Sequence, residues 1–295
     1  MTVHVLGASH ASAGILLRLL KKNNFLYCAY SSSNYQFPGY ESFLNDFQSG
    51  DKIVSFSPII ISSDYASKLI ERGLIPSTCI LLSSTSIFSK VSNGSADASL
   101  FVHFKEGEDK IKTLCQAYST FHPTVLRLPL LWDGKHDKNI AFIRRFSFKY
   151  RFFPICGKAR GLRAPLHVSD LAKVIFNLLG CSDPVPGFYN LMGLQKLSYL
   201  EMVKLIHSFI PTKNFQPLFL FVIPSFLVQI LITTSKSFAP QKILYFLSAL
   251  KRQESDLVFP ENNIFDAIDI KPSKLLLPFV DMLEIEYSKN YMTGG

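Results

Sequence analysis

Short apolar segments alternate with helical patterns through the first two thirds of the chain, and this order restricts the fold more than any other feature. The helical segments show helix signals such as those of residues 63–73, which begin at a polar cap and end at a glycine. The apolar segments predicted as strands are 2–6, 25–30, 51–59, 77–84 and 123–132. This alternation predicts an α/β fold, with a doubly wound parallel sheet and helices on its faces.

The pattern changes near residue 194, where helical segments interrupted by prolines take over. We therefore predict two parts, a domain that holds the sheet over 1–193 and a smaller, mostly helical region over 194–295. Within the first part, residues 145–164 are expected to leave the sheet and extend toward the substrate side. The 295 residues are enough for a sizeable core in either arrangement.

The first predicted strand leads into a turn of small residues, VHVLGASHASAG, and then directly into a helix. Backbone N–H groups at such a helix start bind diphosphates, which is the Rossmann-type dinucleotide site. Gly7 holds the first glycine position of that motif, whereas His10 and Ala13 replace the second and third. The residues expected to line the phosphates are Gly7, Ser9, His10, Ala11 and Ala13.

Other strand ends complete the predicted cofactor site. The second strand is followed by Ser31 and Ser32, with no carboxylate or arginine to select the ribose, which slightly favours NADP over NAD. Ser57, Pro58 and Ser83 follow later strands and are expected to border the nicotinamide, because ligands of open α/β sheets bind at carboxyl strand ends.

Several segments in this order resemble the extended short-chain dehydrogenase/reductase family, in its compact, atypical branch. They are GASHASAG, CILLSSTSIF, TVLRLPLLWDG, LHVSDLAKVI, GFYNLMG and DIKPSKLLLPFVDMLEIEY, and together they cover nearly the whole chain. The resemblance implies a Rossmann-type NAD(P) domain and epimerase, dehydratase or reductase activity on a nucleotide-linked sugar.

The resemblance also implies a catalytic set. Ser84 matches the family's substrate-binding hydroxyl, and Arg160 and Arg163 lie where relatives hold a sugar-nucleotide diphosphate. Leu100 and Phe104 stand where the family has a Tyr and a Lys four residues apart. Neither side chain can move a proton, so the sequence leaves open whether the chain is an enzyme.

Charge and cysteine content limit which ligands and which cellular compartment we expect for this protein. The formal net charge of +9 favours an anionic ligand, but the basic residues are spread along the chain, and we expect no nucleic-acid partner. The five cysteines lack metal-ligand spacing, so no metal site is expected and reduced thiols in a cytoplasmic protein are predicted. A homodimer is left open.

Residues 217–232 form an apolar stretch that is too short to span a bilayer and contains Pro224. We predict a buried pair of helices there. The alternative is an element that lies on a membrane surface, which would make the protein membrane-peripheral.

Three functions follow. The first is an NAD(P)-dependent epimerase or reductase acting on a nucleotide- or lipid-linked sugar in cell-surface polysaccharide metabolism. The second is a catalytically degenerate dinucleotide-binding sensor, scaffold or assembly factor. The third is a membrane-peripheral interaction protein that has lost the cofactor.

Overall fold

A six-stranded parallel sheet forms the centre of the computed structural model, which describes residues 1–31, 39–88, 98–135, 137, 139–210, 219–235, 240–268 and 272. The strands run in the order β10-β5-β4-β3-β1-β2, and every pairing between neighbours is parallel. Their bounds are β1 Val3–Leu6, β2 Tyr27–Tyr30, β3 Lys52–Ser55, β4 Thr78–Ser84, β5 Pro123–Leu128 and β10 Gly187–Asn190. The predicted fold class is confirmed.

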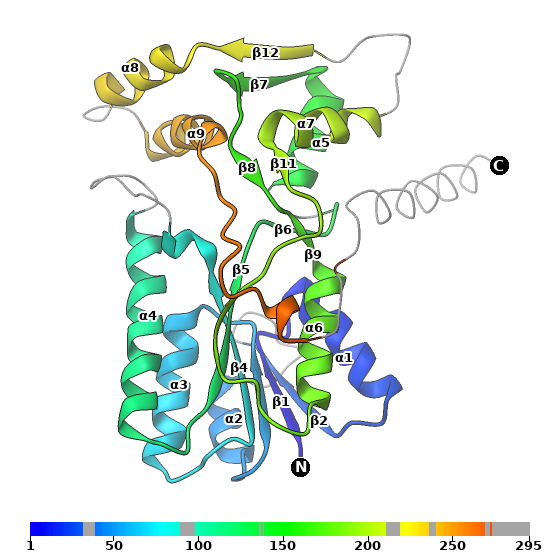
Figure 1. The fold of residues 1–295 in the computed structure, drawn as a ribbon, viewed down its shortest axis with the longest axis vertical. Coiled ribbons are helices and arrows are strands. Elements are labelled where there is room, and N and C mark those ends of the chain that lie inside the picture. The colour runs from blue at the N-terminus through cyan, green and yellow to red at the C-terminus, as the bar shows by residue number, and fades with distance from the viewer. Residues whose placement is uncertain are drawn as a thin grey trace, which may run out of the picture.

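Helices cover both faces of this sheet (Figure 1). On one face, α1 (Ala11–Lys22) packs against α6 (Val168–Gly180), and on the other α3 (Ile59–Glu71) packs against α4 (Ala98–Ala117), with α2 (Tyr40–Asp46) beside β2. In α1, Ala13, Leu16 and Leu20 are buried at helical spacing, which directs that stripe toward the sheet. All four residues of β1 are buried because helices cover both its faces.

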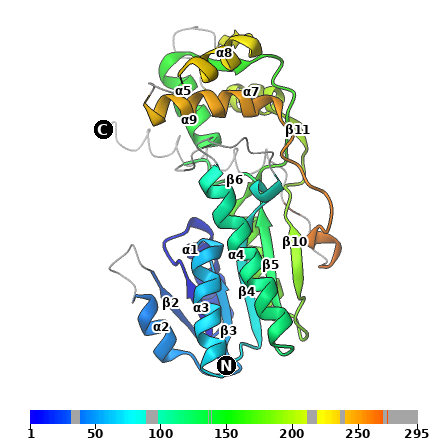
Figure 2. The same ribbon diagram turned by 90° about the vertical axis from the view of Figure 1, so that its left-hand side faces the viewer.

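A second group of elements lies beyond the carboxyl ends of the sheet strands (Figures 1 and 2). Its helices are α5 (Ile140–Tyr150), α7 (Tyr199–Ser208), α8 (Ser225–Ser235) and α9 (Gln241–Lys251). Its strands are β7 (Phe152–Cys156), β8 (Leu162–Arg163), β11 (Leu197–Ser198) and β12 (Phe219–Ile223). Residues 145–164 of the predicted excursion lie in this group.

Shorter elements join the two groups. The strands β6 (Leu131–Trp132) and β9 (Leu166–His167) pair in parallel, and short 3₁₀ helices cover Thr85–Phe88, Arg252–Glu254 and Ile264–Asp266. Ile264 packs into the same core as α1 and α6, so the chain returns from the second group to the sheet.

The structure differs from the predicted elements at two places. Residues 217–232 are not a buried helix pair: Phe219–Ile223 form β12, which pairs in parallel with β7, and α8 follows after Pro224. Pro224 separates the two elements because proline disfavours the helical conformation in the residue before it. In addition, α3 begins at Ile59 rather than Ser63, with Pro58 at its N-cap.

Candidate functional site

The carboxyl ends of β1 and β3 meet where the sheet order reverses, and the turn after β1 lies there. Gly7 has a φ of +76°, which only glycine adopts readily. A Cβ at Gly7 would also lie 3.0 Å from the carbonyl carbon of Phe56 and the amide nitrogen of Ser57. The first glycine is therefore required for the turn to pack against the chain after β3. Open α/β sheets bind ligands at such a point.

His10 caps the helix that follows this turn. Its Nδ1 accepts a hydrogen bond of 3.2 Å from the backbone N–H of Ser12, and its ring stacks on Phe56 with centroids 5.3 Å apart. Burial lowers the pKa of His10 below its usual value, so the imidazole is neutral and the proton lies on Nε2. His10 thus uses one amide of the turn and offers an N–H donor of its own.

The neighbouring amides are also engaged within the turn. The backbone N–H of Ala8 donates to the Tyr30 carbonyl over 3.0 Å, and that of His10 donates to the Gly7 carbonyl over 2.9 Å. Ser9 and Ala11 are exposed, whereas Ala13 is buried against the sheet. Small side chains therefore surround an accessible helix start, and with the Nε2–H of His10 they fit a diphosphate.

Serine hydroxyls join the strand ends around this turn. Ser9 Oγ and Ser31 Oγ are 2.6 Å apart, so the β1 turn is linked to the end of β2. Ser57 Oγ lies 2.6 Å from the hydroxyl of Tyr40, and Pro58 is exposed beside it. Ser32 lies outside the described residues. The predicted cofactor residues that are described thus lie at neighbouring strand ends.

A buried ion pair supports the end of β4. The carboxylate of Glu108 binds Arg127 through two hydrogen bonds, of 2.9 Å from Nε and 2.6 Å from Nη2, and accepts a third of 2.7 Å from Ser83 Oγ. The carboxylate side chain is fully buried, and the Arg127 guanidinium also lies over the Phe88 ring. Charge-assisted hydrogen bonds compensate for its desolvation. Ser83 therefore positions the strand end rather than facing a ligand.

Ser84, the next residue, is half-buried at the carboxyl end of β4. Its Oγ accepts a hydrogen bond of 3.1 Å from the backbone N–H of Ser86 and lies 3.1 Å from Ser86 Oγ. Phe104 lies in α4 and is half-buried against the core between this helix and the sheet. Leu100 lies in the first turn of the same helix. The catalytic role of Ser84 and the loss of the Tyr/Lys pair remain predictions.

The two arginines assigned to substrate differ in their surroundings. Arg160 is exposed. Arg163 is buried, and its guanidinium donates to the carbonyls of Leu162, Ser255 and Arg252 over 2.6 to 2.8 Å. Burial lowers the pKa of Arg163 to about 10. The structure thus gives Arg163 a role in joining the second group to the segment after α9.

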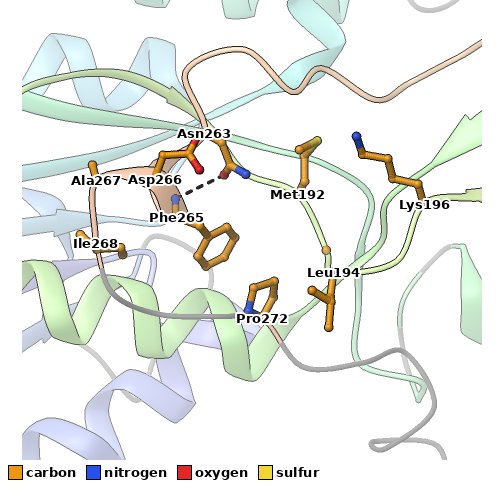
Figure 3. Close-up of a pocket in the computed structure, with 10 residues that line it drawn as sticks. Met192, Leu194, Lys196, Asn263, Phe265, Asp266, Ala267, Ile268 and Pro272 are labelled. Carbon is orange, nitrogen blue, oxygen red and sulfur yellow. Dashed lines mark hydrogen bonds between the residues drawn. The ribbon is translucent and has the colours of Figure 1, made fainter.

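Sequence reasoning missed a cavity of about 510 Å³ on another part of the molecule. Figure 3 shows Met192 and Leu194, from the loop after β10, across the cavity from Asn263 and Phe265. None of the predicted cofactor residues lines this cavity. The segment GFYNLMG contributes only to the family resemblance, and no sequence pattern marks its loop as a site.

The described residues also bear on metal binding, disulfides and membrane spans. In the part of the chain that the structure describes, no group of three or more His, Cys, Asp or Glu side chains could hold a metal ion. The five cysteines are free. No helix among the described residues is long and apolar enough to cross a bilayer.

Several solved structures share this fold. Pal from Bacillus thuringiensis has a TM-score of 0.64 at 12% identity, covering 95% of this chain and 97% of its own. UDP-N-acetylglucosamine 4-epimerase from Bacillus cereus has a TM-score of 0.58 at 15% identity, covering 86% and 95%. UDP-glucose 4-epimerase from Thermus thermophilus, solved with NAD, has a TM-score of 0.54 at 12% identity, covering 85% and 99%.

Sequence comparison alone does not reach these proteins, since no family model and no curated protein matches the chain. The likeness nevertheless extends over most of both chains in each pair. The resemblance predicted from the sequence is therefore confirmed for the fold: this chain has the architecture of the NAD-dependent epimerases and dehydratases.

Proposed function

We propose that this chain binds a nicotinamide dinucleotide at the turn after β1 and acts as an NAD(P)-dependent epimerase or reductase on a nucleotide- or lipid-linked sugar. The observation that carries the proposal is the turn itself. Gly7, with its φ of +76°, places an accessible helix start at the point where the sheet order reverses. Related folds solved with NAD support the same cofactor class.

The residues that would hold the dinucleotide follow from the contacts above. The start of α1 and the Nε2–H of His10 would bind the diphosphate, and the linked hydroxyls of Ser9 and Ser31 would meet the adenosine ribose. A bound nicotinamide would supply hydride transfer to or from a sugar carbon. Ser84 would orient the sugar hydroxyl at the end of β4, because its Oγ–H can rotate from Ser86 toward a substrate oxygen.

The second candidate is a dinucleotide-binding sensor, scaffold or assembly factor without turnover. Phe104 favours this candidate, because its side chain packs against the core at the position where the family that the sequence resembles has a lysine. The two candidates share the cofactor site and differ only in chemistry. Incubation with UDP-sugars and the preferred cofactor, followed by product analysis, separates them.

Binding is tested at Ala11, which is exposed in the first turn of α1. An Asp at this position interacts favourably with the helix dipole, so we expect Ala11→Asp to fold normally. Its negative charge repels a diphosphate, so the variant should bind the dinucleotide about tenfold or more weakly. Ala11→Asn is the matched neutral control and should bind like the wild type. Calorimetric titration with NAD, NADH, NADP and NADPH measures both variants.

Equal affinity of Ala11→Asp and Ala11→Asn would show that the dinucleotide binds elsewhere. Failure of the wild type to bind any of the four cofactors would reject both candidates. The titration also decides between NAD and NADP, because all four forms are compared on one protein.

A further inference from the structure

The end of the molecule farthest from the sheet has an apolar surface. We define the apolar face as the exposed side chains of β12 and α8, two consecutive elements at this end of the molecule (Figure 1). Its large apolar residues are Phe219 and Phe221 on β12 and Phe226, Leu227, Ile230 and Leu231 on α8, while Val222 is exposed on the opposite side of β12. Single exposed apolar residues are ordinary, whereas several on two consecutive elements point to an interaction surface.

The apolar face is held in place by a small core beneath it. Val228 is the buried residue of α8 and packs with Cys156, Leu247 and Leu250. The flanks of α8 remain open, so that Phe226 is 62% exposed and Ile230 is 53% exposed. Phe221 continues the surface toward β7, because its ring lies 6.4 Å from that of Phe152. Exposure of the apolar face is therefore a property of the folded lobe.

Lysines flank the apolar face on two sides. No Asp or Glu occurs in residues 138–169 or 202–253, so all 22 acidic residues lie outside these two segments, whereas Lys and Arg occur throughout both. Lys149 lies over the Tyr150 ring at 5.0 Å, next to Phe152. On the other side, the ammonium of Lys251 donates to the side chain of Gln229 on α8. Basic groups therefore border the apolar face.

An apolar surface flanked by Lys149 and Lys251 matches the surface of an anionic bilayer. The apolar side chains enter the region between headgroups and acyl chains, while lysines bind lipid phosphates. With 11 residues, α8 is roughly 16 Å long, which is too short to cross the hydrocarbon core and suits a helix lying in the interface. We propose that this face docks the protein on an anionic lipid membrane.

The proposal is independent of cofactor binding and is tested without nucleotide. The full chain is mixed with vesicles of phosphatidylcholine alone, or of phosphatidylcholine with phosphatidylglycerol, and the bound fraction is measured by co-sedimentation. We expect binding to the phosphatidylglycerol vesicles, with an affinity that falls as salt is added.

Two matched pairs of variants locate the contact. The double variant Phe226→Ser, Ile230→Ser should lower vesicle affinity about tenfold or more, whereas Leu26→Ser, equally exposed but beside the sheet, should not. The double variant Lys149→Glu, Lys251→Glu should lose the preference for phosphatidylglycerol, and Lys21→Glu, Lys22→Glu on α1 should keep it.

Thermal unfolding midpoints equal to that of the wild type would show that the variants fold. Equal binding to both vesicle types, or wild-type binding by the Phe226→Ser, Ile230→Ser variant, would overturn the proposal. So would a protein that ignores vesicles and forms a dimer that this double variant dissociates, because the apolar face would then join two copies of the chain.

Discussion

Two histidines cap helices in this protein. His10 at α1 and His167 at α6 each accept a hydrogen bond through Nδ1 from the backbone N–H two residues later, over 3.2 Å and 3.3 Å. Serine, threonine, asparagine and aspartate usually do this. Because Nδ1 accepts this hydrogen bond, the proton of the neutral ring lies on Nε2. A histidine cap therefore also offers an N–H donor, which the usual cap residues do not place there. At α1 this donor lies at the proposed diphosphate site.

The role of His10 can be separated from simple obstruction. If its Nε2–H binds the diphosphate, His10→Asn and His10→Gly should both weaken dinucleotide affinity, by about tenfold or more for a charged hydrogen bond. Asparagine preserves the cap, and glycine restores the residue of the usual motif. His167→Asn is the control at the other capped helix. Tighter binding of His10→Gly in a calorimetric titration would show that the ring obstructs the site.

Ser84 is the residue on which turnover depends in the epimerase or reductase proposal. Ser84→Ala should slow turnover by about 100-fold, the scale for losing a positioned proton-transfer partner. Ser86→Ala removes the hydroxyl that Ser84 contacts and should leave the rate nearly unchanged. Rates of sugar conversion measure both, and equal rates for wild type and Ser84→Ala would assign the chemistry to another group.

At the scale of elements, the close approach of α3 and α4 depends on Gly107. A Cβ there would lie 2.7 Å from Ile59 Cγ2 and 2.8 Å from the Ile60 amide nitrogen, so α4 crosses the start of α3 with no room for a side chain. This contact also places Glu108 against the face of the sheet that α4 covers, where its carboxylate accepts hydrogen bonds from Ser83 and Arg127. The packing of two helices therefore sets the position of the candidate catalytic strand end.

Two glycine substitutions should change stability in opposite directions. Gly107→Ala should destabilise the fold by about 1–3 kcal/mol, because overpacking outweighs the gain in helix propensity. Gly14→Ala, in α1 with open space around its Cβ, should stabilise it by up to about 1 kcal/mol. Midpoints of urea unfolding measure both, and a Gly107→Ala variant as stable as the wild type would contradict the close approach.

At the scale of the whole molecule, buried neutral histidines couple stability to pH. Burial lowers the pKa values of His4, His10, His167 and His207 below the ordinary value of 6.5. Between each lowered pKa and 6.5, the unfolded chain binds more protons than the folded one. Stability is therefore full above about pH 6.5 and falls as pH decreases through this window.

Thermal unfolding at a series of pH values between about 5 and 8 measures this dependence. We expect the midpoint to fall toward the acidic end. His207→Gln, which can retain a hydrogen bond to Ser147, should reduce the fall. A midpoint independent of pH in the wild type would contradict the assignment of neutral buried histidines.

The sheet and the second group of elements carry different proposed functions. The proposed cofactor turn lies at the edge of the sheet that faces the second group, and the second group holds the apolar face at its far end. With both proposals, the cofactor turn and the candidate catalytic end of β4 lie at the edge of the sheet that faces the membrane-binding group. A lipid-linked sugar is the substrate class that such an arrangement would favour.

The sequence by itself determined the parallel sheet, its strands and the glycine turn, because periodicity, caps and a positive-φ glycine are local properties of the chain. It did not determine the partners of Arg163 and Glu108, which lie far away in the sequence and meet only after folding. It also could not show that side chains such as Phe221, Phe226 and Ile230 are exposed, because an apolar segment looks the same in the sequence whether it is covered or not. Only the tertiary structure decided that, by pairing β12 with β7 and packing Val228 of α8 against the core while Phe226 and Ile230 stay exposed.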